Sequence, residues 1–514
     1  MTNTLRAVRP VGTRYVRFSA QGDTSDPRTP SEAYNGMQEK WRLVTDLLGG
    51  TDAMRAAGET WLPRETKETP KNYKVRLHRS FLYNGYSGTI DRLAAKPFSK
   101  PVTLPELTDE QLMRIEDDAD GMGSSLTSLG RRLFVDGLVY GKAHVLVDYP
   151  VTAGQETPSL ADERAVGLHP VLLHVSPADV IGWRSEKVNG REELTQVRIR
   201  ERRDETVGKY GSRCVEYVRV VNAPVGGAPG TWELFRCDDK SPAELAPVLV
   251  GTHSYPGVPL LTTYFKRTGY MTSEPPLQDL AEMNLCHWQS NSDHRNYLRF
   301  CRFGMLKVTG ISHEEYEKPL EIAPQFSFKS VSPDADMGYV ETTGAAAKVG
   351  ENDLKRIEER METLGLQPLV ETTADSTAIG KRLDEGRTET MIQTWIRAVE
   401  ELLDASYVAA AQFIGAELPK DFGVDVFSDF AVTSGSTADL DTLLAMRMAG
   451  ELTRLTFLKE VQRRGTLGPN VNVDSEAQEA EAEGPPIDPN APIVDPNNPD
   501  DPSAAGGAGG AFGA

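Results

Sequence analysis

Residues 275–300 read PPLQDLAEMNLCHWQSNSDHRNYLRF, and the organisation of the chain follows from this stretch. Its two prolines suit the first turn of a helix. Apolar residues then recur at helical spacing, at Leu277, Ala281, Leu285 and Trp288. The second half, QSNSDHRN, is strongly polar, and we expect it to face solvent or another subunit. The stretch therefore predicts a long helix with a buried first half.

A β-rich segment and further helices follow this helix. The β-rich segment covers about 40 residues and contains the runs GMLKVTG, PLEIAP and FSFKSV. Helical spacing returns at Leu354, Ile357, Met361 and Leu364, beside i,i+4 charge pairs such as Glu351 and Lys355. After the break GLQPLVETTADST, the longest periodic segment runs from about 377 to 414. Unbroken, it would be about 55 Å long.

Before residue 275, helical patterns give way to strand-like patterns near residue 143. Residues 1–30 look like a loose polar arm. Helical spacing then covers 31–48, with Ser31 as N-cap, 72–95 and 124–140. The β-rich runs that follow have hairpin-like spacing and predict an antiparallel sheet: AHVLVDYP, HPVLLHVSP, TQVRIRE, CVEYVRVV and TWELFRC. Three tryptophans fall on apolar helix faces and predict core packing: Trp41, Trp288 and Trp395.

The charge of the chain is unevenly distributed. The net charge is −19, and the last 44 residues contribute −9 of it without any Lys or Arg, leaving −10 for the body. An acidic body argues against tight nonspecific binding to phosphates, which depends on Lys and Arg. The tail holds seven prolines between Pro485 and Pro502, and this composition predicts disorder. Two short helices, 438–449 and 456–464, precede it.

The cysteines and the apolar runs indicate the cellular compartment of the protein. Cys214, Cys237, Cys286 and Cys301 form no C-x-x-C pair, so reduced structural thiols are expected. No apolar run is long enough to span a bilayer. The N-terminus lacks the features of a secretory signal. These observations predict a protein that stays in the cytosol where it is made.

Three patterns come near to catalytic or ligand-binding motifs and fall short. GLVYGKAH at 137–144 has three residues where a phosphate loop needs four before Gly-Lys, so a helix end at Gly141 followed by a strand is the better interpretation. GYSG at 85–88 is one residue short of a nucleophile elbow. His287, Asp293 and His294 share a helix but not one face, which argues against a metal site. The sequence thus predicts no enzyme, no cofactor and no metal.

Several phrases, in this order along the chain, resemble a portal-like family catalogued as a domain of unknown function. They are YNGYSGTIDRLAAKPFSKPV, DGLVYGKAHVLVDYP, HPVLLHVSPADVIGW, and GVPLLTTYF followed by PPLQDLAEMNLCHWQSNSDHRNYL. The order of helices and β-rich segments is similar to that of tailed-phage portal proteins. The resemblance covers roughly residues 30–465. It implies an α+β, mainly helical portal-type fold that assembles as a ring, usually of twelve subunits, around a DNA channel.

The resemblance also implies a division of the chain into portal regions. These are a flexible arm at 1–30, a wing at 31–275, stem helices at 276–299 and 345–365, a clip at 300–344, a tunnel loop at 366–376, a further wing part with the long helix and a strand at 377–435, short crown-like helices at 436–470 and the tail at 471–514. Larger portals have a longer C-terminal helical region than this sequence. An extended crown is therefore not expected.

The resemblance assigns DNA-facing residues and partners. The tunnel loop would present Thr372, Thr373, Asp375 and Ser376 to the DNA. If the second stem helix lines the channel, four basic residues would meet phosphates: Lys348, Lys355, Arg356 and Arg360. The implied partners are double-stranded DNA, the terminase large subunit, the major capsid and scaffolding proteins and a head-tail adaptor. The implied location is the portal vertex of the virion, where the ring serves DNA packaging and ejection.

Two other interpretations remain. A different phage head protein, such as a minor capsid protein, would share the helical content without forming a channel. A nuclease or protease is the third, and it would depend on His287 and His294.

Overall fold

The computed structural model describes residues 26–150, 168–237, 245–303, 305–310, 313, 333–340, 345–366, 391–428, 437–463, 467, 473 and 476. These residues form both helices and β-sheets. The chain separates into two compact units, Met1–Ser428 and Asp429–Ala514. None of the described helices combines the length and the apolar character needed to cross a membrane.

The first unit begins with a layer of helices. They are α1 (Glu32–Leu48), α2 (Gly50–Ala57), α3 (Pro70–Arg79), α4 (Gly85–Ala95), α5 (Glu110–Asp117) and α6 (Leu126–Tyr140), with 3-10 turns η1 (Gly58–Thr60) and η2 (Pro97–Ser99). Ser31 caps α1 as predicted, because its Oγ accepts a hydrogen bond from the Tyr34 N–H at 3.2 Å. Core packing of the three tryptophans is confirmed, since Trp41, Trp288 and Trp395 are 2%, 0% and 3% exposed.

The prediction of one helix over 72–95 is wrong, because α3 and α4 are separated by residues 80–84. Asn84 starts α4, and its side chain accepts a hydrogen bond from the Ser87 N–H at 3.1 Å. Asn favours such N-cap positions because its side chain replaces a missing backbone acceptor. Apolar periodicity continues across the gap, so the spacing alone did not reveal the break.

The β-rich region forms two sheets within the first unit. One has the order β2-β1-β8, and the other has the order β3-β4-β5-β6-β7. Every strand pair in both is antiparallel, as predicted. The strands are β1 (Lys142–Asp148), β2 (Val171–Val175), β3 (Val180–Val188), β4 (Arg191–Val207), β5 (Gly211–Asn222), β6 (Gly230–Arg236), β7 (Pro247–His253) and β8 (Leu260–Tyr264), followed by the small pair β9 (Arg267–Gly269) and β10 (Thr272–Ser273).

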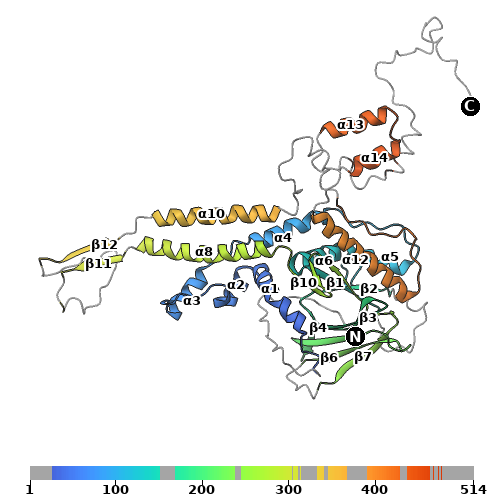
Figure 1. Cartoon of the computed structure of the whole chain (residues 1–514), viewed down its shortest axis with the longest axis horizontal. Helices are drawn as coiled ribbons and strands as arrows, with labels where there is room; N and C mark the ends of the chain where they lie inside the picture. Colours follow the sequence, from blue (N-terminus) through green and yellow to red (C-terminus); the bar gives the residue numbers. More distant parts are fainter. Residues whose placement is uncertain are drawn as a thin grey trace, which may run out of the picture. The chain divides into compact units, whose positions relative to one another are not determined.

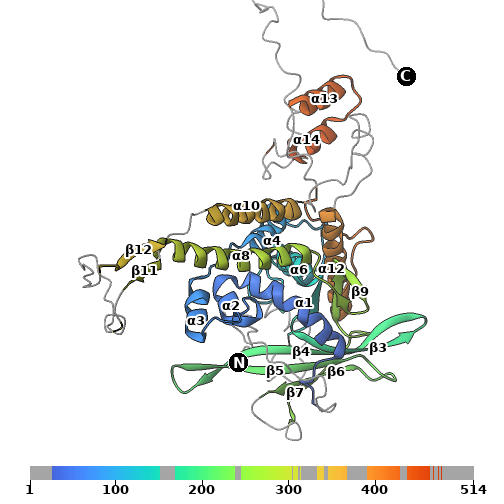
Figure 2. The same ribbon diagram turned by 60° about the vertical axis from the view of Figure 1, so that its left-hand side comes forward.

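The two sheets share one apolar core. Leu146, Val171 and Leu260 of the smaller sheet are buried together with Val197 and Val221 of the larger one. Figure 2 shows the long central strands β4 and β5 of the larger sheet. The other face of the smaller sheet packs on α6 and on α12 (Met391–Ile414). The smaller sheet is therefore covered on both sides, which accounts for the fully buried run in β1.

The junction between α6 and β1 is where the sequence GLVYGKAH lies. Gly141 ends α6 with a φ of 77°, and β1 begins at Lys142, as predicted. A Cβ at Gly141 would lie 1.9 Å from the backbone oxygen of Glu274. Both the left-handed conformation and this close approach require glycine.

A pair of long helices completes the first unit. They are α8 (Gln278–Phe303) and α10 (Ala345–Leu366), which lie side by side (Figure 1), with the antiparallel strands β11 (Met305–Thr309) and β12 (Asp336–Val340) between them in sequence. β11 lies in the predicted run GMLKVTG, the runs PLEIAP and FSFKSV lie outside the described residues, and β12 lies in the predicted β-rich region 300–344 but in none of its three runs. Of the predicted helix over 377–414, residues 391–414 are described and are helical throughout. Between 415 and 428 Asp425 forms an isolated bridge with Thr103, and residues 429–435, which also belong to the region with the predicted strand, lie outside the described residues.

The described part of the second unit consists mainly of two short helices. They are α13 (Thr437–Met448) and α14 (Arg454–Arg463), and they correspond to the two helices predicted there. The arm at 1–25 and nearly all of the acidic tail lie outside the described residues.

Candidate functional site

The first part of the site is a row of buried amides on α8. The Asn284 side chain is 0% exposed. Its Oδ1 accepts a hydrogen bond from the Tyr86 N–H at 2.8 Å, and its Nδ2 donates to the Tyr83 carbonyl at 2.8 Å. Two turns later, Asn291 Nδ2 donates to the Phe81 carbonyl at 3.2 Å. These side chains satisfy carbonyl groups of the segment between α3 and α4 and an N–H group in the first turn of α4, where the helix supplies no acceptor.

The expectation that the polar half of α8 faces solvent or another subunit is therefore wrong for one of its faces. Asn291 and Ser292 are buried, and the Ser80 hydroxyl donates to Ser292 Oγ at 2.8 Å. The signal that could have revealed this is spacing. Asn284, Trp288 and Asn291 recur at i, i+4 and i+7, which places both amides on the same face as a buried tryptophan.

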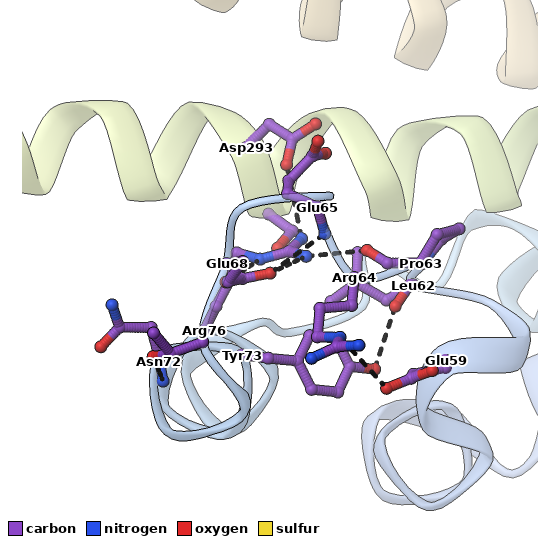
Figure 3. Close-up of polar contacts among 12 residues, drawn as sticks. Glu59, Leu62, Pro63, Arg64, Glu65, Glu68, Asn72, Tyr73, Arg76 and Asp293 are labelled. Atoms are coloured by element: carbon purple, nitrogen blue, oxygen red, sulfur yellow. Dashed lines mark hydrogen bonds and ion pairs between the residues drawn. The ribbon is translucent and has the colours of Figure 1, made fainter.

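A buried arginine fixes α3 and the preceding loop against α8. Arg76 pairs with Glu68 through two hydrogen bonds of 3.0 and 2.9 Å, and a further hydrogen bond reaches the Pro63 carbonyl at 2.8 Å. Figure 3 shows these contacts, with Asp293 of α8 above them, 3.5 Å from the Arg76 guanidinium. The hydrogen bond from Arg76 holds the pKa of Glu68 below its ordinary value. A buried ion pair stabilises the packing of helices only when additional hydrogen bonds satisfy its charged groups, and Arg76 makes such bonds to Glu68 and Pro63.

The contact between α8 and α10 combines a hydrogen bond and a close approach. His287 Nε2 lies 3.0 Å from Glu358 Oε1, and the His287 ring packs on Tyr83 with ring centres 5.1 Å apart. Further along the pair, a Cβ at Gly350 would lie 2.5 Å from His294 Nδ1. The absence of a side chain at Gly350 therefore lets the two helices approach closely.

The structure does not bring the three candidate metal ligands together. His287 pairs with Glu358, Asp293 faces Arg76, and His294 packs against Gly350. Among the described residues, no group of three or more His, Cys, Asp or Glu side chains could hold a metal ion. Lys142 also has no phosphate-binding geometry, because its side chain is fully buried and its Nζ donates to the Met271 carbonyl at 2.7 Å.

The four basic residues predicted to meet DNA all lie on α10 and are all exposed. They do not form one stripe. Lys348 and Lys355 lie within about 20° of each other around the helix axis, and Arg356 and Arg360 lie together about 100° away. Lys355 pairs with Glu351 at 3.3 Å, and α10 carries five acidic residues beside the four basic ones. The helix is thus a mixed-charge surface instead of a basic track.

Two predicted elements of the site lie wholly or partly outside the described residues. The tunnel-loop residues Thr372, Thr373, Asp375 and Ser376 all fall in the undescribed segment 367–390. Of the region predicted as a clip, the described parts are the end of α8 and the β11 and β12 pair with its adjoining residues.

Sequence comparison identifies one matching family model. Residues 276–414 match the family described as Domain of unknown function (DUF4055). The match begins just before α8 and ends with the last residue of α12. No curated protein matches the chain.

Structural comparison finds distant similarity to chains of gene transfer agent particles. A chain of "Virion of native gene transfer agent (GTA) particle" has 13% identity and a TM-score of 0.36, covering 74% of this chain and 88% of that chain. A chain of "Neck of native GTA particle computed with C12 symmetry" has 13% identity and a TM-score of 0.35, with the same coverage. A chain of "Neck of empty GTA particle computed with C6 symmetry" has 12% identity and a TM-score of 0.36, covering 74% and 89%.

Proposed function

We propose that this chain is a structural subunit of a tailed-phage particle, and specifically a portal subunit that forms a ring around a DNA channel. The observation that carries the proposal is the helix pair. Two long helices lie side by side, and the chain between them contains a two-stranded antiparallel hairpin. The stem and clip of a portal, as implied by the sequence resemblance, have this order.

The contacts of Asn284, Asn291 and Asp293 with the helical layer, called the seam below, support a mechanical role for the helix pair α8 and α10. Buried amides and the Arg76 pair attach α8 firmly to α3 and to the segment that leads into α4. A stem must keep its position while DNA moves past it, and satisfied buried polar networks favour one rigid arrangement. In this proposal α8 and α10 are the stem, and β11 with β12 belongs to the clip.

The charges suit a channel that DNA slides through. Lys348 and Lys355 lie on the side of α10 opposite buried Ile357 and Met361, where a channel-lining helix would meet phosphates. The balance of acidic and basic residues on α10 would keep such contacts weak, since nonspecific affinity scales with the phosphates neutralised. The packaging force would come from a separate motor, the terminase large subunit, with capsid, scaffolding and adaptor proteins as the other partners. The ring would be located at the portal vertex of the virion.

Imaging of the purified full-length protein by negative-stain electron microscopy tests this function. We expect a uniform closed ring with a central opening. A preparation that contains only monomers or irregular aggregates, under conditions where the chain is folded, would contradict the proposal.

A second experiment tests the loop. Deleting residues 372–376 should leave rings intact and reduce the DNA retained in particles, because these side chains are proposed to face the DNA. If the deletion prevents ring formation, the loop has an assembly role instead.

One observation favours a second candidate, a phage head protein without a channel. The exposed surface of α10 has as many acidic as basic residues, four of each, so it has no net positive charge to attract DNA. The same images distinguish the two candidates, because only the portal requires a central opening.

A further inference from the structure

The exposed surface of α10 carries two flanks of opposite net charge, with Asp353 beside the two arginines of one flank and Lys355 beside the two glutamates of the other. Arg356 and Arg360 are four residues apart and lie on one flank, about 40° from each other around the axis. Glu351 and Glu362 are eleven residues apart and lie within about 20° of each other on the other flank. The centres of the two flanks are about 150° apart, on either side of the exposed face. All four side chains are exposed.

The subunit leaves these charges available for an intermolecular contact. Within the described part of the chain, Arg356, Arg360 and Glu362 have no ion-pair partner. Glu351 pairs only with Lys355, and both of these side chains are more than half exposed, at 61% and 63%. Exposed pairs of this kind contribute little and exchange partners readily. Val349 is 69% exposed and lies on the arginine flank, seven residues before Arg356, where it would add an apolar contact.

The two flanks also lie at the same height along the helix. The midpoint of Arg356 and Arg360 and the midpoint of Glu351 and Glu362 differ by about 2 Å along the axis, from 1.5 Å per residue. In a cyclic ring, each copy is related to the next by rotation alone, so residues at the same height along the ring axis meet across the interface. With α10 parallel to that axis, as proposed for a stem helix, the two flanks lie at the same height. A head-to-tail contact requires two different, complementary surfaces on one subunit, and a two-fold contact requires one surface that complements itself. The α10 flanks satisfy the first requirement and not the second.

We infer that α10 is a subunit-to-subunit contact in which the Arg356 and Arg360 flank of one copy meets the Glu351 and Glu362 flank of the next copy. This inference rests on the proposed ring. It divides the four basic residues of α10 between two roles: Lys348 and Lys355 face away from the buried side of the helix, and the two arginines contact the neighbour. Salt weakens the contact, because the charges are exposed before assembly.

Charge reversal on each flank tests the inference. In the first full-length variant Arg356→Glu and Arg360→Glu are combined, and in the second Glu351→Arg and Glu362→Arg are combined. Each variant alone should lose assembly, because like charges then face each other at every interface. An equimolar mixture should recover rings in which the two variants alternate, because every interface then joins an acidic flank to a basic one. Native mass spectrometry reads out both the assembly and its alternating composition.

A matched control uses Lys348→Glu combined with Lys187→Glu at the exposed end of β3, which changes the net charge as much as the arginine variant does and leaves both flanks intact. This control should still assemble, and circular dichroism should show that all variants are folded. If the wild type forms rings and both flank variants form them equally well, or if mixing does not restore them, the inference is wrong and the portal proposal stands. If the wild-type chain forms no ring, the portal proposal itself is wrong.

Discussion

The buried lysine at the start of β1 gives the sharpest test of the energetics of this fold. Lys142 is 0% exposed, and its Nζ has the Met271 carbonyl as hydrogen-bond acceptor and lies 5.4 and 5.2 Å from the ring centres of Trp41 and Trp183. Burial lowers its pKa from 10.5 to about 7. The unfolded chain therefore keeps this proton up to pH 10.5, and the folded chain releases it near pH 7.

This difference predicts how stability depends on pH. Between pH 7 and pH 10.5 the unfolded state binds more protons at this position, so the free energy of unfolding rises with pH. Each pKa unit corresponds to about 1.4 kcal/mol, and the full interval therefore amounts to about 5 kcal/mol. Lys142→Met removes the titrating group and should remove this rise.

Urea denaturation followed by circular dichroism, at several pH values between 7 and 10.5, measures the effect. Groups that titrate in both proteins cancel when the variant is compared with the wild type. Lys187→Met, on the exposed end of β3, is the matched control and should give a curve parallel to the wild type. Parallel curves for the wild type and Lys142→Met would refute the reasoning, because they would mean that Lys142 is charged in the folded protein across this range.

Three further substitutions test the seam and the α6 to β1 junction. Asn284→Ala should lower the free energy of unfolding by about 1–3 kcal/mol, because it leaves the Tyr86 N–H buried without an acceptor and removes one of the two donors to the Tyr83 carbonyl. Asn352→Ala, exposed on α10, should cost less than about 0.5 kcal/mol in the same urea denaturation, and equal losses would contradict the role of Asn284. Glu68→Gln should cost about 3 kcal/mol at neutral pH, because it leaves the Arg76 charge buried. The pKa of Glu68 is lower in the folded state, so its contribution to the free energy of unfolding is present above pH 4.5 and is lost as the pH falls through the folded pKa. A stability difference between Glu68→Gln and the wild type that stays constant in acid would be inconsistent with the Glu68 and Arg76 pair. Gly141→Ala should lower the thermal midpoint of unfolding at least twice as much as Gly208→Ala. Both positions have positive φ, but of the two only Gly141 also faces a backbone oxygen, that of Glu274. Equal shifts of the midpoint would count against this close approach.

Much of the secondary structure of this chain could be predicted from local patterns. Ser31 as a helix start, the helix end at Gly141 and the antiparallel strands each follow from signals within a few residues. The break between α3 and α4 could not be predicted in this way, because the segment that interrupts the helix is held by Asn284 and Asn291, about 200 residues later. Local propensity cannot report a partner so distant in sequence.

The site was predicted less completely than the fold. Apolar periodicity located α8 and the second half of α10, and the family resemblance supplied the bounds 276–299 and 345–365. Periodicity treats every polar residue as exposed, which is why the buried Asn284, Asn291 and Arg76 were missed. Their burial is stable only because each finds hydrogen-bond partners on another element, and a single sequence does not state that pairing.

The seam along α8 also determines how this helix would respond to force. The amides and the Arg76 contact attach it to the α3 region as far as Asp293, and Arg295 lies over the Phe81 ring at 4.6 Å, while α10 packs along another side of the helix. The remaining eight residues extend about 12 Å further. A load applied at β11 and β12 would therefore enter both helices of the pair, and α8 would pass its share to the helical layer over the stretch from Asn284 to Arg295.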